Sequence, residues 1–295
     1  MIDRKAENRS AAVIKYTKRV LVYAFLGLCA LAILFPFYIA VITSFKPFTE
    51  ANNVEFTWWP KHFTLHGYAD VFTYTGGTTV NSPLVLLGFF NTLWMVLPRT
   101  IVGTLVSGMA AFAYAKLNFR VKKISFNLLL LTMMVPGVIM LIPSYMLYYW
   151  YGWLNTPLPV IIPSLLGGTS AIFFIRQYYL GVPNDMMEAA QLDGLGYFGT
   201  YFYIMLPIAM PAFWAQFIIG FISGYNEYLG PMLYLKEASL LTLQLALQQF
   251  SSSRGNTDPG AVMSAALVAL VPTITLFVIA QKQFISGIVT SGLKL

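Results

Sequence analysis

Three carboxylate side chains, those of Asp185, Glu188 and Asp193, share one short polar segment between two strongly apolar segments. Neighbouring carboxylates can exchange protons in catalysis, and they can equally hold a helix in place. Asp185 and Glu188 match a D-x-x-E helix start, in which the first acid caps the helix and the second reaches back to a free N–H. Gly194 would end that helix, because glycine adopts the left-handed backbone without a Cβ clash. The spacing therefore predicts positioning groups rather than a catalytic set.

A second short helix is expected from about Tyr197, and it runs into Pro207, where the fifth apolar segment begins. Together the two helices would form an elbow over 183–207. Ala189 and Ala190 would keep one side of this elbow slim enough to enter a groove of a partner. A capped helix on a membrane surface, without any partner, would explain the acids as well.

Other residues with possible chemistry give weaker patterns. His62 and His66 stand at the spacing that puts two imidazoles on one helix face, which suits a metal ion. The segment offers no neighbouring acid or cysteine as a third ligand, and Pro60 argues against a helix, so we expect two loop histidines and no metal site. The single cysteine, Cys29, lies in an apolar run and forms no disulfide within the chain. The sequence contains no Gly-Lys-Ser loop for ATP and no G-x-S-x-G elbow for hydrolysis.

The composition places these groups in a membrane protein. The chain has 295 residues, of which 58% are apolar and 10% are charged, whereas about 25% charged residues is usual in soluble domains. A helix needs about 20 apolar residues to cross a bilayer. We therefore expect an all-α integral membrane protein with a six-helix domain over 20–282. The expected helices are Val20–Thr43, Leu84–Ala115, Ile124–Tyr149, Leu154–Ile175, Leu206–Asn226 and Ala261–Ala280.

Basic residues indicate which side of the membrane each connection faces, because cytoplasmic connections are rich in Lys and Arg. They gather in the N-terminal tail (1–19) and in the 116–123 connection, and Arg176, Lys282 and, in the C-terminal tail (283–295), Lys294 are further cations on the same side. Few lie in the other two long connections, 46–83 and 234–259, which are therefore expected outside. Both termini and the elbow are expected in the cytoplasm. The net charge of +7 follows from this topology and does not predict nucleic-acid binding.

Two segments keep alternative roles at this point. The N-terminal tail could be a solvated tail or a short amphipathic helix on anionic lipid. In the first outer loop, Trp58, Trp59 and Pro60 fit an anchor at the membrane interface, and contact with a sugar is the alternative.

Ionisable residues inside or beside membrane spans are costly and indicate function. Arg99, next to Pro98 in the second span, could face a pore, pair with an acid of a partner chain, or bind carbonyls that the proline frees. Glu227 lies with Tyr225 and Asn226 at the outer end of the fifth span. It could meet a carbohydrate, act as a gate, or serve packing.

The elbow also carries a motif. The pattern E-A-A, three residues, G, nine residues, I-x-L-P is filled, with Asp193 before the glycine, by Glu188, Ala189, Ala190, Gly194, Ile204, Leu206 and Pro207. Together with six spans at the right offsets, it resembles the permease subunits of binding-protein-dependent ABC importers over nearly the whole chain. Leu195 departs from that family, which commonly has alanine there, and it enlarges the elbow slightly.

Further segments resemble the maltose-type carbohydrate importers, in particular the smaller, six-span permease of that heterodimer. They are Phe90-Asn91-Thr92, Tyr225-Asn226-Glu227-Tyr228 and Thr290-Ser291-Gly292-Leu293-Lys294. The resemblance implies the type I importer permease fold, with the motif residues of the elbow seated in a groove of an ATPase subunit. It also implies that Ser291, Gly292 and Lys294 reach between two ATPases. The candidate substrate or gate residues are Asn91, Arg99, Tyr225, Asn226 and Glu227.

The same resemblance implies partners. A second, homologous permease would complete the channel, two ATP-binding subunits would hold ATP and Mg, and an extracytoplasmic binding protein would deliver a sugar. The chain itself would carry no cofactor and no catalytic residue, and it would lie in the lipid of a bacterial cytoplasmic membrane. A permease of the same architecture for another solute, such as a polyamine or phosphate, is the alternative. A membrane-embedded enzyme is a third possibility, and it would require a metal or an acid–base cluster inside the spans.

Overall fold

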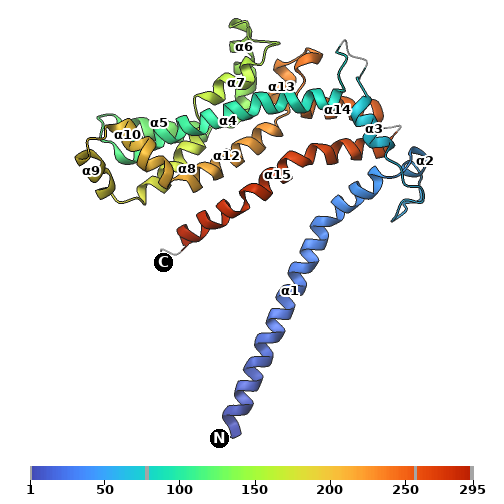
Figure 1. Cartoon of the computed structure of the whole chain (residues 1–295), viewed down its shortest axis with the longest axis horizontal. Coiled ribbons are helices and arrows are strands. Elements are labelled where there is room, and N and C mark those ends of the chain that lie inside the picture. Colours follow the sequence, from blue (N-terminus) through green and yellow to red (C-terminus); the bar gives the residue numbers. More distant parts are fainter. Residues whose placement is uncertain (1, 77–79, 256–257, 293–295) are drawn as a thin grey trace. The chain divides into compact units, whose positions relative to one another are not determined.

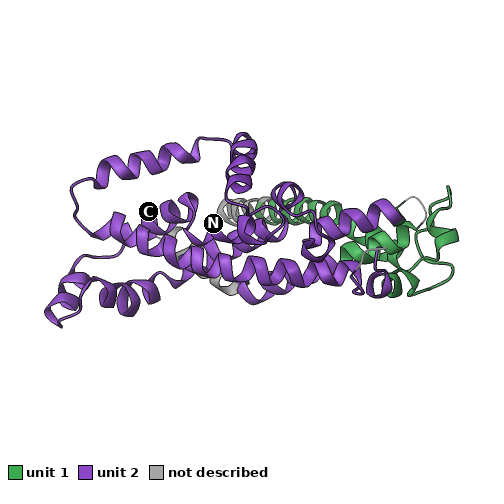
Figure 2. Cartoon of the chain, turned by 90° about the horizontal axis from the view of Figure 1, so that it is seen from above, with its two compact units in different colours: residues 1–70, 254–267 green, residues 71–253, 268–295 purple. Residues whose placement is uncertain are grey.

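The computed structural model describes residues 2–76, 80–255 and 258–292, and over these residues it is helical with no strand (Figure 1). The all-α fold expected from the sequence is confirmed. The chain forms two compact units (Figure 2). Unit 1 comprises residues 1–70 and 254–267, and unit 2 comprises residues 71–253 and 268–295.

Within the described residues, four helical segments are long and apolar enough to cross a membrane. The number rises to as many as six if each of two bent helix pairs counts as one span. The four segments are Lys15–Ser44, Leu84–Lys116, Leu158–Leu180 and Pro259–Gln281. The bent pairs are Lys122–Met133 with Gly137–Trp150, and Tyr197–Ile208 with Met210–Tyr225.

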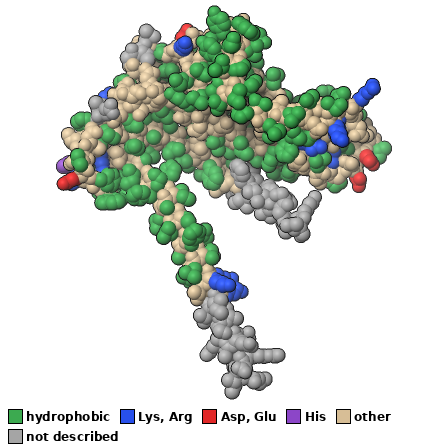
Figure 3. Space-filling model, turned by 180° about the vertical axis from the view of Figure 1, so that it is seen from behind, with side chains coloured by type: hydrophobic (Ala, Val, Ile, Leu, Met, Phe, Trp, Pro, Cys, Tyr) green, Lys and Arg blue, Asp and Glu red, His purple; other side chains and the backbone are tan. Residues whose placement is uncertain are grey.

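Unit 1 contains the long helix α1 (Ile2–Ser44), the short α2 (Phe48–Ala51) and the start of α3 (His66–Thr73). The N-terminal tail is part of α1 and not a separate helix. Only 6% of the most apolar 18-residue stretch in Lys15–Ser44 is buried. Exposed hydrophobic side chains cover this part of α1, and cationic side chains lie toward one end (Figure 3). Such a surface requires an apolar solvent, because exposed apolar area in water is unfavourable.

The loop after α2 is folded around one carboxylate. Glu50 accepts hydrogen bonds from the Thr57 hydroxyl at 2.6 Å and from the N–H of Lys61 at 3.0 Å. Lys46 donates from Nζ to the carbonyl of Thr57 at 2.5 Å, and its ammonium lies 4.2 Å from the centre of the Phe56 ring. These bonds order a loop that contains little regular structure of its own.

Unit 2 is built around helix α4 (Leu84–Lys116), which packs most extensively against α8 (Thr169–Leu180), then α12 (Met210–Tyr225) and α7 (Leu158–Leu165). Small residues permit the close contacts, as is usual between membrane helices. A Cβ on Gly103 would clash with the carbonyl oxygen of Ser164, and one on Gly108 would clash with the Phe213 ring. The backbone of α4 can therefore touch α7 and α12 only because glycine stands there.

The third expected span is not one straight helix. It is divided into α5 (Lys122–Met133), a 3-10 turn (Gly137–Met140) and α6 (Leu141–Trp150), and the two halves are bent by 91°. The break coincides with Pro136, whose preceding residue is disfavoured in the helical conformation.

The fourth expected span is also divided, into α7 and α8. The break at Leu166–Gly168 contains Gly167 with a φ of 90°, a left-handed conformation that glycine adopts without strain. The segment starts and ends later than the expected Leu154–Ile175, at Leu158 and Leu180.

The fifth expected span, Leu206–Asn226, begins with a bent entrance. Helix α10 (Tyr197–Thr200), a π-helix (Tyr201–Met205) and α11 (Leu206–Ile208) lead to α12 across a bend of 79°. Pro207 lacks an N–H, so the regular bond pattern is interrupted in this stretch.

The remaining elements are α13 (Leu229–Tyr234), a 3-10 turn (Ala238–Leu240), α14 (Leu243–Arg254) and α15 (Pro259–Gly292). The second outer loop, 234–259, therefore holds a helix of 12 residues. Helix α15 continues past the expected end at Ala280 into the C-terminal tail. Ser291 and Gly292 are its last residues, and Lys294 lies outside the described residues.

Candidate functional site

The elbow predicted from the sequence is present as α9 (Asp185–Leu192), followed by Gly194 with a φ of 81°. The N–H of Leu195 donates to the carbonyl of Ala190 at 2.9 Å, and the N–H of Gly194 donates to the carbonyl of Gln191 at 3.0 Å. These two bonds form a Schellman motif, which satisfies carbonyls that the end of a helix leaves free. The glycine stop is confirmed.

The predicted cap by Asp185 is wrong. Asn184 occupies the cap position, Asp185 is the first helical residue, and no side chain caps the helix. Oδ1 of Asn184 instead accepts a hydrogen bond from Nζ of Lys116 at 2.8 Å, and the same ammonium donates to the carbonyl of Val182 at 2.5 Å. The end of α4 is thereby tied to the beginning of the elbow.

One face of α9 is packed against the protein and the other is open. Met187 and Ala190 are buried. The expectation that Ala190 helps to enter a partner's groove is therefore wrong, whereas Ala189 is exposed. The open face carries Leu192, which is 89% exposed, beside the three exposed acids of the elbow.

The buried face of the elbow belongs to an apolar cluster shared with α4, α8 and α12. Two phenols add hydrogen bonds to it: Tyr201 donates to the carbonyl of Leu105 at 3.0 Å, and Tyr178 donates to the carbonyl of Ile208 at 3.1 Å. The last residues of the motif follow directly on Tyr201, with Ile204 and Leu206 half-buried and Pro207 exposed. A displacement of α9 would thus be passed to the helices of unit 2.

A polar cavity of about 570 Å³ lies between α4, the α7–α8 break and α12. Small and polar residues dominate its wall, and none of the described side chains that line it is aromatic. Arg99 and Glu227 belong to the wall, with Gly103 and Ser107 of α4 and Gln216 of α12. A space lined by hydroxyl and amide groups suits a polar solute.

Arg99 joins three segments at this cavity. Its Nη1 donates to the carbonyl of Val160 on α7 at 2.6 Å, and its Nη2 donates to Oε2 of Glu227 at 2.9 Å. The guanidinium side chain is 8% exposed and the carboxylate side chain 40% exposed. Arg99 therefore pairs with an acid of its own chain, where the sequence suggested a partner chain or carbonyls near Pro98.

The other three candidate substrate residues do not line the cavity. Asn91 donates to the carbonyls of Ser239 at 2.8 Å and Leu241 at 3.0 Å. The buried hydroxyl of Tyr225 donates to the carbonyl of Ala269 at 2.8 Å. Asn226 is exposed, and its side chain donates to the carbonyl of Ile222 at 2.9 Å.

Sequence reasoning passed over several residues of the cavity wall. Gln216 is an uncharged amide inside an otherwise apolar span, and its isolation there was the available signal. Ser107 holds the broken helix to α4, because its hydroxyl donates to the carbonyl of Gly103 at 2.7 Å and accepts from the N–H of Gly168 at 2.9 Å. A lone serine in an apolar helix gives no comparable signal.

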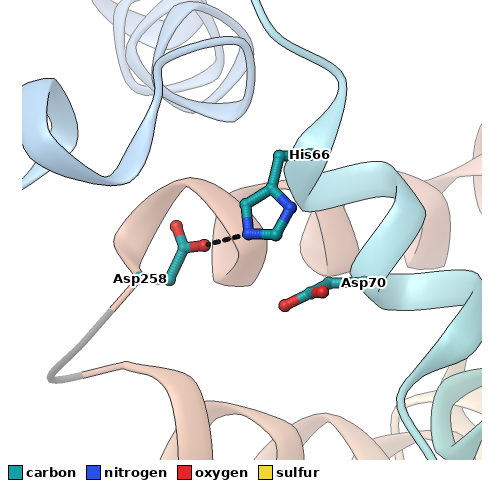
Figure 4. A group of neighbouring side chains, drawn as sticks. All are labelled: His66, Asp70 and Asp258. Carbon is teal, nitrogen blue, oxygen red and sulfur yellow. Dashed lines mark ion pairs between the residues drawn. The ribbon is translucent and has the colours of Figure 1, made fainter.

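A second polar cluster lies in unit 1, and it corrects the expectation that His66 has no acid nearby. Nε2 of His66 lies 3.6 Å from Oδ2 of Asp258, with Asp70 close by (Figure 4). His62 precedes α3 and is not part of the group. Asp70 pairs with Arg254 at 3.1 Å, and Asp258 also accepts the N–H of Ala261 at 3.0 Å. Because both carboxylates already have cationic or N–H partners, we interpret the cluster as an ion-pair network that stabilises the start of α15.

Comparison with protein families gives a match over nearly two thirds of the chain. The family described as binding-protein-dependent transport system inner membrane component matches residues 103–289. These residues include the elbow and most of the cavity wall.

Several known proteins are similar over nearly their whole length. The arabinooligosaccharides transport system permease protein AraQ of Bacillus subtilis is 32% identical, with 94% of this chain and 96% of that protein covered. The lactose transport system permease protein LacG of Rhizobium radiobacter is 29% identical, with 91% and 94% covered. The sn-glycerol-3-phosphate transport system permease protein UgpE of Yersinia enterocolitica is also 29% identical, with 88% and 92% covered.

One solved structure has the same fold. It is the crystal structure of a bacterial ABC transporter involved in the import of the acidic polysaccharide alginate. A chain of it aligns with a TM-score of 0.75 at 20% identity, covering 90% of this chain and 95% of that one.

Proposed function

The chain belongs to the family of binding-protein-dependent transport system inner membrane components, and we propose that it is the permease subunit of an importer for a sugar or oligosaccharide. The relatives AraQ and LacG are named for sugar transport, which supports this substrate class. The observation that carries the proposal is the polar cavity of about 570 Å³ among membrane-spanning helices. A neutral solute rich in hydroxyl groups fits such a wall.

The chain acts with partners in this proposal. A second permease completes the channel, and two ATP-binding subunits hydrolyse ATP, for which this sequence has no binding loop. An extracytoplasmic binding protein delivers the sugar. The distribution of Lys and Arg supports an orientation with both termini and α9 on the cytoplasmic side of a bacterial cytoplasmic membrane.

In this proposal the elbow is the part of the chain that contacts an ATP-binding subunit and moves with it. Its open face offers Leu192 as an apolar contact, flanked by exposed Glu188 and Asp193 as hydrogen-bond acceptors. Its other face belongs to the apolar cluster of unit 2. A motion of an ATP-binding subunit is thereby transmitted as a rigid-body displacement of α4, α8 and α12.

Arg99 and Glu227 form a gate at the cavity in this mechanism. Glu227 follows the outer end of α12, so its pair with Arg99 lies toward the outer side of the span. While the pair is formed, α4, α7 and the end of α12 are held together. Entry of the sugar from outside requires these three segments to separate.

A second candidate solute is a phosphorylated one, because UgpE is named for sn-glycerol-3-phosphate. Arg99 supplies a cation in the cavity for such a ligand. Glu227 already neutralises that cation, and this favours the neutral sugar.

Reconstitution tests the function directly. The chain is purified with its second permease and ATP-binding subunits, placed in liposomes, and supplied with the binding protein and radiolabelled arabinotriose, lactose, glycerol-3-phosphate or spermidine. ATP-dependent uptake of one of the two sugars is expected. Uptake of glycerol-3-phosphate or spermidine alone would overturn the sugar assignment, and failure of the chain to co-purify with an ATP-binding subunit would overturn the transport role.

A further inference from the structure

Gln216 is a polar residue in the cavity wall that neither the elbow nor the Arg99–Glu227 pair uses. Its exposed fraction is 9%, and within the part of the chain that the structure describes its side chain has no hydrogen-bond partner. Its amide atoms are not fully enclosed by protein and reach the cavity surface, where a polar group inside a membrane-spanning segment gains from a solute partner. Gln216 is therefore placed to bind something that enters the cavity.

Helix α8 presents further donors to the same space. Its N-cap residue is Gly168, and no side chain caps this end. The N–H of Gly168 donates to Ser107 at 2.9 Å. The N–H groups of the next three residues, Thr169, Ser170 and Ala171, have no carbonyl one turn earlier in the helix. Gly168, Ser170 and Ala171 line the cavity, so the uncapped N-terminus opens into it.

The break between α7 and α8 puts these donors well inside the span. Gly167 takes a φ of 90°, and a Cβ there would lie 2.8 Å from the Ser107 hydroxyl. A larger residue at this position would clash with Ser107 and push the break away from α4. The glycines thus keep backbone donors accessible at a depth where a continuous helix would hide them.

The chemistry of the two groups indicates the ligand. The amide of Gln216 both donates and accepts, as a sugar hydroxyl does, and the N–H groups of α8 donate to hydroxyl oxygens. The charge of Arg99 is matched by Glu227 within the same wall. Because the described residues of the cavity wall include no aromatic side chain, we expect hydrogen bonds rather than a stacking surface to hold a sugar there. Such a site releases its ligand readily, as transport requires.

We propose that Gln216 and the N-terminus of α8 form a sugar subsite inside the membrane, which binds ring hydroxyl groups during passage through this chain. The proposal rests on the proposed function as a sugar permease and deepens it. The subsite acts after the binding protein has released the sugar. Its loss therefore affects how much sugar crosses for each ATP, and not the stimulation of hydrolysis by the loaded binding protein.

The experiment uses the complete importer in liposomes, saturated with binding protein loaded with radiolabelled arabinotriose, or with lactose if the wild-type importer carries that sugar. Gln216→Leu removes the amide and keeps the approximate volume. Gln177→Leu is the matched control, because it makes the same exchange at an exposed residue of α8 that does not line the cavity. Uptake and ATP hydrolysis are measured on the same vesicles.

Gln216→Leu should lower the sugar imported per ATP about three- to tenfold, the factor expected for one neutral hydrogen bond. Gln177→Leu should match the wild type. Monodeoxy analogues of the sugar should include one for which wild type and Gln216→Leu perform alike, because that analogue already lacks the bond. Such an analogue would separate loss of a sugar contact from loss of coupling at the elbow.

Two results would overturn the subsite. They are an unchanged ratio of sugar to ATP in Gln216→Leu and equal losses for every deoxy analogue. If Gln216→Leu fails to assemble, Gln216→Asn decides, because it keeps a shorter amide: a reduced ratio in the assembled complex supports the subsite, and a wild-type ratio contradicts it. Absence of sugar uptake by the wild type would instead refute the function itself.

Discussion

Arg99 on α4 and Glu227 after α12 form an ion pair with 2.9 Å between Nη2 and Oε2, although 128 residues separate them in the chain. Arg99 also bonds the carbonyl of Val160, so one guanidinium connects three segments at the wall of the cavity. The planar fork of arginine makes both contacts at once, and lysine could not do so in the same geometry.

Neutralising the acid should weaken the closed state of the cavity. In Glu227→Gln the ion pair is lost while the shape is kept, so we expect ATP hydrolysis without binding protein to rise severalfold and its stimulation by loaded binding protein to fall. ATPase assays on the purified complex measure both. Glu237→Gln is the control, because Glu237 is exposed and lies outside the cavity. Unaltered stimulation together with unaltered sugar uptake would exclude a required role for the pair.

Gly194→Val should uncouple ATP hydrolysis from uptake while membrane insertion is kept. Gly194 has a φ of 81° and open space where a Cβ would stand, so the effect of Val comes from the backbone alone, with a strain of about 1–3 kcal/mol. Gly196→Ala is the matched control, since Gly196 has a φ of −72° and equally open space. Sugar uptake and ATP hydrolysis in liposomes give the result. Normal transport by Gly194→Val would refute the coupling role of the elbow.

Removing the ammonium of Lys116 should loosen the elbow. Lys116→Met loses the bonds to the Val182 carbonyl and Asn184, so amide hydrogen exchange over 182–196 should become about tenfold faster and uptake per ATP should fall. Lys116→Arg should restore most of both. Lys123→Met, at an exposed position of the same connection, should leave both as in the wild type. Unchanged amide hydrogen exchange in Lys116→Met would show that the Lys116 bonds to Val182 and Asn184 do not hold the elbow in place.

The sequence was sufficient for the helical fold and for the elbow, because those features rest on local patterns. The stop at Gly194 depends on one residue type and a short-range bond pattern, so it could be predicted. The cap at Asp185 could not be judged in the same way. The helix starts one residue earlier than expected, at Asn184, whose side chain accepts a hydrogen bond from Lys116, 68 residues away, and does not cap the helix. A local sequence pattern does not show such a long-range bond.

Long-range pairing also explains what the sequence missed in the cavity. Arg99 is unusual in an apolar span, but its acid follows the end of another helix, and the sequence does not indicate that the two residues meet. Asn91 and Tyr225 belong to conspicuous motifs, yet their side chains bond backbone carbonyls away from the cavity. The type of a residue indicates that it needs a partner, and only the fold determines which partner it has.

The loop around Glu50 should open in acid. Burial raises the pKa of Glu50, but hydrogen bonds from Thr57, Lys61 and His62 and the charge of Lys46 outweigh it, so the pKa lies below its usual value of 4.5. A carboxylate with a lowered pKa stabilises the fold above its unfolded pKa and ceases to do so as the pH falls through the folded value. Limited proteolysis should therefore cut within 46–66 faster as the pH falls further below that usual value.

Glu50→Gln should be cut faster at neutral pH as well, because the neutral amide binds these donors more weakly. Glu55→Gln is the control, since Glu55 is exposed in the same loop and bonds Asn53 through its backbone N–H, which the substitution keeps. Equal cleavage of Glu50→Gln and wild type at neutral pH would show that the loop does not depend on this carboxylate.

The two exposed tryptophans of this loop should lie at the lipid–water interface on the outer face of the cytoplasmic membrane. Helix α1 provides the scale: from Arg19 at the inner side, about 30 Å of hydrocarbon at 1.5 Å per residue ends near Tyr38. The Tyr38 hydroxyl donates to the carbonyl of Trp58 at 2.5 Å, and the ring of Phe35 lies 6.2 Å from the ring of Trp58. The loop therefore brings Trp58 back to the depth of the lipid headgroups, where tryptophan is enriched in membrane proteins.

A spin label can test that depth, because Cys29 is the single cysteine and lies about 15 Å from Arg19 along α1, near the centre of the bilayer. A label at Cys29 should be accessible to oxygen and shielded from a water-soluble nickel reagent. A label at Trp59→Cys in a Cys29→Ser background should show intermediate access to both. High access to nickel that falls only when loaded binding protein is added would contradict the interface position, and it would place Trp58 and Trp59 in contact with the delivered sugar or its carrier.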